Sequence, residues 1–449
     1  MSTAVIILAA GQGSRMKSDL PKVLHKIAGA PMLWHAMQRA QQIEAEKTVV
    51  VVGHGGELAE KSAMEFDAEA SIVWQSEQNG TGHAVQQAAD VLNGFDGDAF
   101  VLYGDTPFVQ PETLDKMRVA RKDNAVVVLG FEAETPGGYG RLVMDGDQLD
   151  AIVEAKDCTA EQAAISFCNS GVICAPAPLL FSLLGDVGNE NANGEYYLTN
   201  IVGIARARGL ACTAISCDEA ETMGVNSRLD LARAEAVFQG NARMEALENG
   251  VTLTAPDTVH FAFDTHIGRD AIIEPNVFFG PAVTIESGAT IRAFSHLEGC
   301  HVARDCQVGP YARLRPGAEL DLGAKVGNFV EIKAAQIDAG AKINHLSYVG
   351  DARVGEQSNI GAGAIFCNYD GVNKHHTEIG KRVFVGSNSA LVAPVSIGDD
   401  GFVATGSVVT NDVEEGALAI ARTRQVNKPG LGIRMMDRLR AAKAARNSK

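Results

Sequence analysis

The chain has 449 residues and a formal net charge of −16. One hydrophobic core normally stops growing below this length, so we expect at least two domains. The acidic balance argues against a nucleic-acid binder or an anionic-membrane binder, because such proteins need a basic face.

The cysteines and the N-terminal apolar run indicate a cytoplasmic protein. The eight cysteines form no CxxC pair of the metal-binding kind, so we expect reduced thiols and no zinc site. The apolar run from Ala4 to Ala10 is too short to cross a bilayer and leads into a glycine loop. It predicts a buried strand and no membrane association.

Residues 1–225 alternate apolar, strand-like runs with helical stretches, which is typical of βαβ units in a mostly parallel, Rossmann-like sheet. The clearest predicted strands are residues 4–8, 47–52, 71–74, 99–102 and 125–129. In such a sheet, ligands bind at the carboxyl ends of the strands.

The first predicted strand ends in a glycine loop that favours phosphate binding. Gly11 and Gly13 let backbone N–H groups approach a phosphate. Met16 stands where a dinucleotide-binding loop has its third glycine, so hydride transfer is disfavoured. Arg15 and Lys22 alone would be interpreted as surface cations, but after a GxG turn they suit a triphosphate.

A carboxylate follows the strand at residues 99–102. Asp105, in the sequence Tyr103-Gly104-Asp105, is a hard oxygen ligand of the kind that Mg²⁺ bound to phosphates requires. By itself it could be only a turn cap. Gln75 and the small-residue loop Gly80-Thr81-Gly82 follow another strand and are expected at the same edge, which favours the metal interpretation.

Residues 226–249 predict a long connecting helix. Their composition shifts to Ala, Arg, Glu and Leu. One face is predicted to be apolar, formed by Leu229, Leu231, Val237, Phe238, Met244 and Leu247.

Residues 250–449 contain a hexapeptide repeat that predicts a left-handed parallel β-helix, followed by a basic C-terminal tail. From Ile267 an apolar residue recurs at every sixth position, a period that fits no α-helix but fits one short strand per six residues. Glycine often follows the inward residue, where we expect it to permit positive φ at the corners: Gly268, Gly327, Gly355, Gly361, Gly380, Gly386 and Gly398.

Such a β-helix could serve only for threefold oligomerisation, but three departures from the repeat favour a binding site. They are the polar cluster around His345, the interruption at residues 367–378, and the cations Arg313, Arg315 and Lys333. His345 is the candidate general base, because imidazole titrates near the working pH of an enzyme. The adjacent His375 and His376 are interpreted as solvated.

The motifs LAAGQGSRM, PKVLH, QNGTGHA, YGD, GGYGR, GEYYLT and GVNSRLDL resemble those of bifunctional N-acetylglucosamine-1-phosphate uridyltransferases and glucosamine-1-phosphate acetyltransferases. The resemblance covers nearly the full chain. It implies acetylation of glucosamine 1-phosphate by acetyl-CoA, followed by Mg²⁺-dependent uridylyl transfer from UTP. It also implies a bacterial cell-wall role and a homotrimer.

For the first domain, the resemblance implies roles for individual residues. The nucleotide would be held by Leu8, Ala9, Ala10, Gly11, Lys22, Gln75, Gly80, Thr81, Tyr103, Gly104 and Asp105. The amino sugar would contact Gly140, Glu154, Asn169 and Asn226, and Mg²⁺ would be bound by Asp105 and Asn226. Arg15 and Lys22 would stabilise the phosphates.

For the second domain, the resemblance places a catalytic motif at HLSY, which supports His345 as the base. The sugar phosphate would contact Arg315, Lys333, Tyr348, Asn359 and Lys374. Acetyl-CoA would contact Asn368, Tyr369, Ser387, Thr405 and Arg422. Two positions depart from the family pattern: Thr405 replaces an alanine, and Asn200 stands where an aspartate is usual, which puts any role of Asn200 in doubt.

Two other functions remain as alternatives. One is a sugar-1-phosphate nucleotidylyltransferase with a single activity and a regulatory β-helix, which a missing base and CoA loop would favour. The other is a non-catalytic assembly or sensor protein, against which Arg15, Lys22 and Asp105 count.

Overall fold

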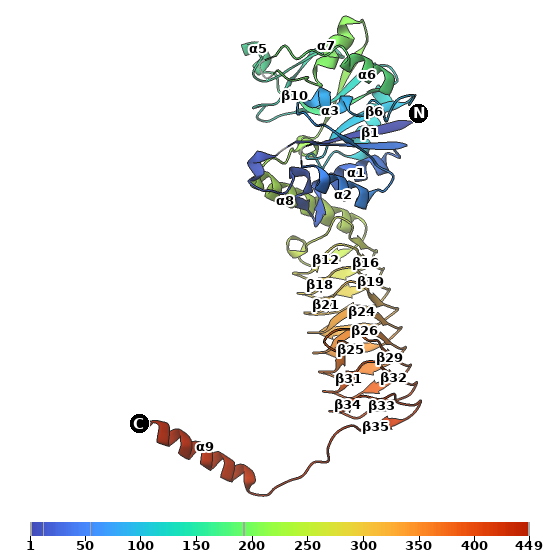
Figure 1. Cartoon of the computed structure of the whole chain (residues 1–449), viewed down its shortest axis with the longest axis vertical. Helices are drawn as coiled ribbons and strands as arrows, with labels where there is room; N and C mark the ends of the chain where they lie inside the picture. The colour runs from blue at the N-terminus through green and yellow to red at the C-terminus, as the bar shows by residue number, and fades with distance from the viewer. Residues whose placement is uncertain (1, 12, 54, 192–193, 448–449) are drawn as a thin grey trace. The chain divides into compact units, whose positions relative to one another are not determined.

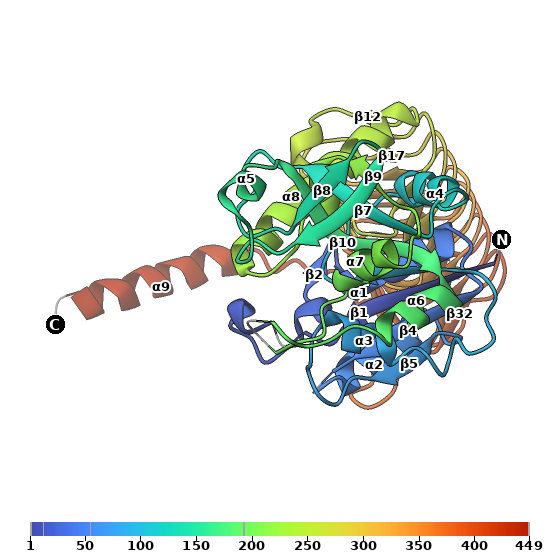
Figure 2. The same ribbon diagram turned by 90° about the horizontal axis from the view of Figure 1, so that it is seen from above.

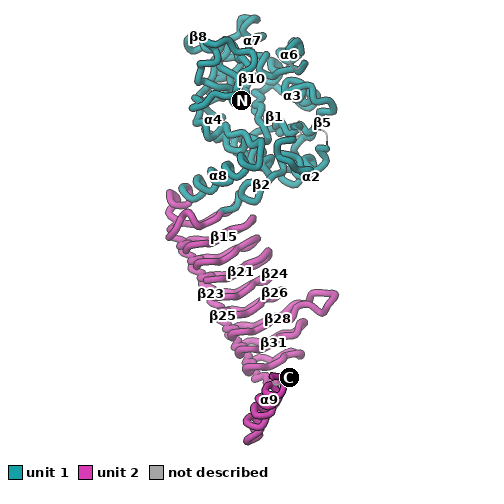
Figure 3. The backbone as a smooth tube through the Cα atoms, turned by 90° about the vertical axis from the view of Figure 1, so that its left-hand side faces the viewer, with its two compact units in different colours: residues 1–244, 261–263 teal, residues 245–260, 264–449 magenta. Residues whose placement is uncertain are grey.

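The computed structural model describes residues 2–11, 13–53, 55–191 and 194–447. The chain divides into two compact units, coloured separately in Figure 3. Unit 1 comprises residues 1–244 and 261–263, and unit 2 comprises residues 245–260 and 264–449. The division falls inside helix α8 (Arg228–Glu248), which lies where the connecting helix is predicted.

Unit 1 contains a mostly parallel sheet, as predicted. Its strand order is β11-β7-β10-β6-β1-β4-β5, with β8 and β9 attached through β10. Strand β10 runs antiparallel to β6 and β7, and the other pairs along this order are parallel. The bounds are β1 (Thr3–Ala9), β4 (Lys47–Val52), β5 (Ser71–Trp74), β6 (Asp98–Tyr103), β7 (Val126–Glu132), β8 (Arg141–Asp145), β9 (Gln148–Val153), β10 (Phe167–Pro176) and β11 (Cys212–Cys217). A separate two-stranded sheet pairs β2 (Lys26–Ile27) with β3 (Ala30–Pro31).

Helices cover both faces of this sheet, because alternate residues of its strands point to opposite sides. In β1, Val5 and Ile7 pack in one core cluster, while Ile6 and Leu8 pack in another. The first face is covered by α1 (Met32–Gln42), α2 (Glu57–Phe66) and α4 (Pro111–Ala120). The second is covered by α3 (Thr81–Gln86), α6 (Ala177–Leu184) and α7 (Asn200–Ala207), seen on the other side of the sheet in Figure 1. The short helix α5 (Ala160–Ala163) precedes β10.

The predicted apolar face of α8 is only partly correct. Leu231, Val237 and Phe238 pack against a small core cluster of unit 1. Leu229 and Met244 are instead about three-fifths exposed, at 61% and 58%, and Leu247 is also exposed. The spacing predicts one apolar face, whereas the cluster contacts the helix over residues 231–238.

Buried His35 on α1 gives unit 1 a predictable pH dependence. Its Nε2 lies 3.0 Å from the Ile27 carbonyl oxygen, and burial lowers the pKa of the ring to about 4. The unfolded chain therefore binds a proton more readily than the folded chain does. As far as His35 is concerned, the free energy of unfolding keeps its full value above pH 6.5 and falls as the pH drops toward 4. We expect a loss of about 3 kcal/mol over that window.

The measurement is urea unfolding followed by tryptophan fluorescence, since both tryptophans, Trp34 and Trp74, lie in unit 1. The His35→Gln variant keeps a neutral donor toward Ile27 and should lose most of this slope. An equally steep slope in that variant would contradict the assignment.

Unit 2 is a left-handed parallel β-helix with three faces, stacked coil on coil (Figure 1). One face consists of β12 (Thr252–Leu253), β14 (Ile272–Ile273), β17 (Thr290–Ile291), β20 (Gln307–Val308), β23 (Lys325–Asn328), β25 (Lys342–His345), β27 (Asn359–Ile360), β30 (Phe384–Val385), β33 (Phe402–Val403) and β35 (Leu418–Ala419). The predicted inward residues are buried, except Ile267 at the first coil, which is half-buried.

The other two faces are joined through the longer strands β24 (Glu331–Ile337) and β26 (Tyr348–Val354), which bend around a corner. The second face adds β13 (His266–Ile267), β16 (Val283–Ile285), β19 (Cys300–Val302), β22 (Ala318–Leu320), β29 (Thr377–Ile379) and β32 (Val395–Ile397). The third adds β15 (Phe278–Phe279), β18 (His296–Leu297), β21 (Arg313–Leu314), β28 (Ile365–Cys367), β31 (Ala390–Val392) and β34 (Val408–Val409).

The predicted role of the repeat glycines is wrong. None of Gly268, Gly327, Gly355, Gly361, Gly380, Gly386 and Gly398 has positive φ. These positions need glycine because the next coil passes too close: a Cβ at Gly327 would lie 2.0 Å from the Asn344 carbonyl oxygen. The left-handed corner positions are often taken by other residues, such as Phe294, Tyr311 and Phe329.

Two segments depart from the repeat. The insertion, residues 367–378, leaves the stack after β28 and projects from it in Figure 3. Helix α9 (Leu431–Asn447) lies within the basic C-terminal tail and stands away from the coils, with no buried residue (Figures 1 and 2). In the part of the chain that the structure describes, no helix is long and apolar enough to span a membrane.

Candidate functional sites

The cavity in unit 1 lies at the carboxyl ends of β1 and β6. Its volume is about 320 Å³. Nine of the predicted nucleotide residues line it: Leu8, Ala10, Gly11, Lys22, Gln75, Gly80, Thr81, Tyr103 and Asp105. Ala9 is instead buried in the core, and Gly104 donates its backbone N–H to the Leu8 carbonyl beneath the cavity.

Two glycines are needed for the shape of this cavity. Gly13 has φ +61°, and a Cβ there would lie 2.5 Å from Cβ of Lys22. Gly80 has φ +103°, and a Cβ there would lie 2.7 Å from the Tyr196 carbonyl oxygen. The same carbonyl accepts a hydrogen bond from the Gly82 N–H at 2.8 Å, so residues 194–198 close one side of the loop.

The predicted cations and metal ligands converge at the cavity. The Lys22 ammonium forms an ion pair with Asp105 and lies 3.2 Å from Oδ1 of Asn226. Arg15 donates to the same Asn226 oxygen at 2.9 Å. Asn226 is brought here because the Val225 N–H donates to the Asp105 carbonyl oxygen at 2.9 Å. Two oxygen atoms therefore already converge on one cation, Nζ of Lys22.

The predicted sugar residues lie next to this cluster. The Asn169 N–H donates to the Gly140 carbonyl oxygen at 2.8 Å, and Thr199 donates to Glu154 at 3.2 Å. Burial, followed by the carboxylates of Asp105 and Glu154, raises the pKa of the Tyr103 phenol. This phenol therefore stays neutral.

In unit 2, His345 is exposed at a corner of the prism, at the edge of a cavity of about 370 Å³. Three of the predicted acetyl-CoA positions, Ser387, Thr405 and Arg422, lie at the same corner on later coils. The backbone hydrogen bonds that stack these coils join Gly363 to His345, Asn388 to Ala362, and Gly406 to Ser387. A Cβ at Gly386 would lie 2.4 Å from the Thr405 N, and one at Gly406 would lie 3.9 Å from Cδ of Arg422. His345, Ser387, Thr405 and Arg422 thus form one column.

Polar side chains gather on the neighbouring face around Asp351. Lys333 lies 3.3 Å from Asp351, which also accepts a hydrogen bond from Asn368. Asn368 lies 3.3 Å from the Tyr348 hydroxyl. The nearby Lys333 ammonium lowers the pKa of Lys374, and Arg315 adds to the effect. Such crowded cations favour an anionic ligand.

The other predicted residues of unit 2 contact a carboxylate or backbone groups. Arg315 is held by Glu331 at 2.9 Å. Asn359 lies in register with Lys342 and Phe384 on the first face, whereas Lys333 lies on β24. Tyr369 donates to the Gly371 carbonyl at 2.6 Å, inside the insertion.

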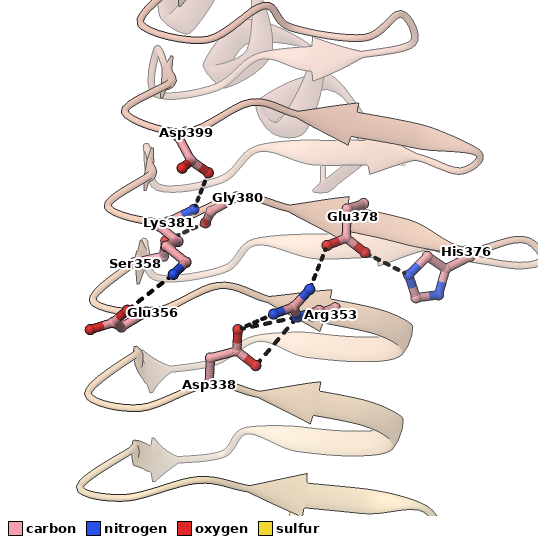
Figure 4. A network of polar contacts seen from close by, with 9 residues as sticks. All are labelled: Asp338, Arg353, Glu356, Ser358, His376, Glu378, Gly380, Lys381 and Asp399. Carbon is pink, nitrogen blue, oxygen red and sulfur yellow. Dashed lines mark hydrogen bonds and ion pairs between the residues drawn. The ribbon is translucent and has the colours of Figure 1, made fainter.

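The insertion is held by its own polar contacts, and both histidines within it keep solvent exposure, as predicted, at 33% for the His375 side chain and 58% for that of His376. His375 lies 2.7 Å from Asp370, and this contact lowers the pKa of Asp370. His376 lies 3.1 Å from Glu378, which is linked through Arg353 to Asp338 on the preceding coil (Figure 4). These contacts fix the end of the insertion to the stack.

The sequence interpretation missed several residues at both sites. Gln78 and Glu195 also line the cavity of unit 1, and both stand within motifs already noted, QNGTGHA and GEYYLT. Asn200 lines a separate hollow of about 360 Å³ with Thr199 and Asp186. Asp351 and Glu331 were missed in unit 2, where a carboxylate beside an anion site carries no sequence signal.

Family models match two parts of the chain. A MobA-like NTP transferase domain matches residues 5–182, and a hexapeptide repeat of succinyl-transferase matches residues 377–411. Among solved structures, a UDP-glucose pyrophosphorylase complexed with UDP-glucose aligns with a TM-score of 0.42 at 18% identity, covering 54% of this chain and 100% of that one. That likeness is too low to support an argument.

Curated relatives match along the whole chain. The bifunctional protein GlmU of Ruegeria sp. (strain TM1040) is 63% identical over 446 residues, covering 99% of each protein. That of Roseobacter denitrificans is also 63% identical, over 444 residues and 99% of each protein. That of Dinoroseobacter shibae is 58% identical over 449 residues and 100% of each. With identity at this level along its full length, the chain belongs to the family of bifunctional GlmU proteins.

Proposed function

We propose that the chain makes UDP-N-acetylglucosamine in two steps, one at the candidate site of each unit. As a GlmU protein it is both a uridylyltransferase and an acetyltransferase. One observation supports assigning one reaction to each unit. Phosphate-binding loops and an oxygen cluster lie in unit 1, while an exposed imidazole and a cation cluster lie in unit 2.

Acetyl transfer comes first, at His345. The amine of glucosamine 1-phosphate attacks the thioester carbonyl of acetyl-CoA, the C–S bond breaks, and CoA leaves as the thiol. Nε2 of His345 accepts the proton that the amine loses and passes it to the departing sulfur, so that the protons balance. Arg315, Lys333 and Lys374 hold the phosphate, while the column from Ser387 to Arg422 provides a path along the coils for the cofactor.

Uridylyl transfer follows at the cavity of unit 1. A phosphate oxygen of N-acetylglucosamine 1-phosphate attacks the α-phosphorus of UTP, and the bond to pyrophosphate breaks. Catalysis consists of holding two anions in line while Lys22 and Arg15 offset the charge that develops. Glu154, Asn169 and Gly140 orient the sugar, and no covalent intermediate is required.

The donor set at this cavity fits a divalent metal ion, and we propose Mg²⁺. Asp105 and Asn226 offer hard oxygen ligands that already converge on a cation. Among the described residues no group of three or more His, Cys, Asp or Glu could hold a metal, which agrees with an ion bound mainly by phosphates and water. When bound, Mg²⁺ would neutralise charge on the phosphate oxygens.

We further propose a homotrimer located in the cytoplasm. The corner below His345 exposes a ladder of aromatic rings, Phe294, Tyr311 and Phe329, stacked at 5.0 and 5.1 Å and each about half exposed. Stacked exposed aromatic rings favour burial against another subunit. All eight cysteines are free thiols, which favours a reducing compartment.

The test is an assay with two separate readouts. The purified chain is given glucosamine 1-phosphate, acetyl-CoA, UTP and Mg²⁺, and free thiol and pyrophosphate are followed independently. We expect both products, with pyrophosphate release depending on prior acetylation. Pyrophosphate release with no thiol release at any time would contradict the acetyltransferase site.

A further inference from the structure

Asn328 lies directly beneath His345 in the stack. Strands β23 and β25 pair in parallel with Asn328 opposite His345, so the two side chains share one corner on successive coils. The His345 Nδ1 lies 2.7 Å from the Oδ1 of Asn328. The close approach depends on Gly327, where a Cβ would lie 2.0 Å from the Asn344 carbonyl oxygen.

This contact decides which ring nitrogen of neutral His345 carries the proton. An amide oxygen only accepts hydrogen bonds, so it favours the tautomer with a proton on Nδ1. The lone pair is then on Nε2, the nitrogen that a general base needs. The opposite tautomer would place two acceptors against each other and leave Nε2 already protonated.

We propose that Asn328 is a positioning residue for acetyl transfer, which fixes the tautomer and ring orientation of His345 without touching either substrate. The inference rests on the proposed role of His345 as the base. A neutral amide suits this task, because it orients the ring without adding a charge beside it. The analogous carboxylate would favour the protonated ring, which cannot act as a base.

Two cations and a phenol also lie near His345. Arg292 and Lys325 line the same cavity, as does the phenol of Tyr311. Tyr348 belongs to the neighbouring face, where its backbone lies in register with that of Glu331. Asn328, by contrast, is in direct hydrogen-bond contact with the ring.

The first test compares steady-state acetyl transfer by the full chain with that of Asn328→Ala. We expect kcat to fall about 10- to 100-fold, with KM for glucosamine 1-phosphate and for acetyl-CoA within about twofold. Uridylyl transfer in the same protein should be unchanged and shows that the chain is folded. The matched control is Gln336→Ala, which removes an exposed amide of β24 outside this cavity and should leave kcat unaltered.

The second test is the pH profile of Asn328→Asp. This variant keeps an acceptor but adds a negative charge, so the acid limb of kcat/KM should move up by about one pH unit, with activity recovered at alkaline pH. A residue that acts only in packing would not move that limb. If His345→Ala is inactive, either of two results would overturn the inference. One is an unshifted acid limb of kcat/KM in Asn328→Asp, and the other is an unchanged kcat in Asn328→Ala. If His345→Ala retains acetyl transfer, the base itself is misassigned.

Discussion

Replacing Asp105 by alanine is expected to reduce uridylyl transfer at least about 100-fold. The carboxylate is the charged member of the oxygen pair that would bind the metal, and it is also the ion-pair partner of Lys22. Its removal leaves Asn226 as the remaining oxygen ligand and frees the Lys22 side chain. The measurement is pyrophosphate release from UTP and N-acetylglucosamine 1-phosphate at several Mg²⁺ concentrations.

The matched control is Asp115→Ala, which removes a carboxylate from the exposed surface of α4. This control should keep full activity, and both variants should release thiol from acetyl-CoA at the normal rate. Unchanged turnover of Asp105→Ala at saturating Mg²⁺ would rule out the metal assignment.

Replacing His345 by alanine is expected to reduce acetyl transfer about 100- to 10,000-fold. The amine of the substrate would then have no positioned base to accept its proton. Release of free thiol from acetyl-CoA measures the loss. Pyrophosphate release from supplied N-acetylglucosamine 1-phosphate should stay at the level of the unmodified chain.

The control for this variant is His301→Ala. That imidazole is also partly exposed on the β-helix but lies between Glu286 and Glu319 on other coils. Acetyl transfer should tolerate its loss. A His345→Ala variant that keeps acetyl transfer within a few fold of the unmodified chain would exclude the proposed base.

The architecture of both units was predictable from the sequence because each depends on a local period. The six-residue spacing from Ile273 to Val409 specifies which side chains point inward, and nearly every one is buried. The strands of unit 1 were likewise visible as short apolar runs, and two of them, β4 and β5, have the predicted bounds.

Features that depend on how coils stack were harder to predict. The glycines that follow the inward residues suggested tight corners, yet Gly327 is required by the passing Asn344 carbonyl on the next coil. Positive φ is instead adopted at the corners by residues as large as Tyr311. A one-dimensional pattern shows that a position needs glycine but does not show which neighbour requires it.

Contacts between residues far apart in the sequence limited how much of the sites could be predicted. Arg15 and Asn226 are separated by 211 positions and meet only because the chain returns to Asp105 through Val225. No spacing rule connects them, so the resemblance to a known family was needed to place Asn226. The contact between Asn328 and His345 spans one coil and could have been found by aligning the repeats.

We propose that one chain contains two separate catalytic sites joined by a free intermediate. The most direct test is to mix the Asp105→Ala and His345→Ala proteins with glucosamine 1-phosphate, acetyl-CoA, UTP and Mg²⁺, and to measure UDP-N-acetylglucosamine by mass spectrometry. Each protein alone should make almost none, while the mixture should make it at a rate set by the slower remaining site. A mixture that stays inactive, although each variant retains its own half-reaction, would rule out two separate sites joined by a free intermediate.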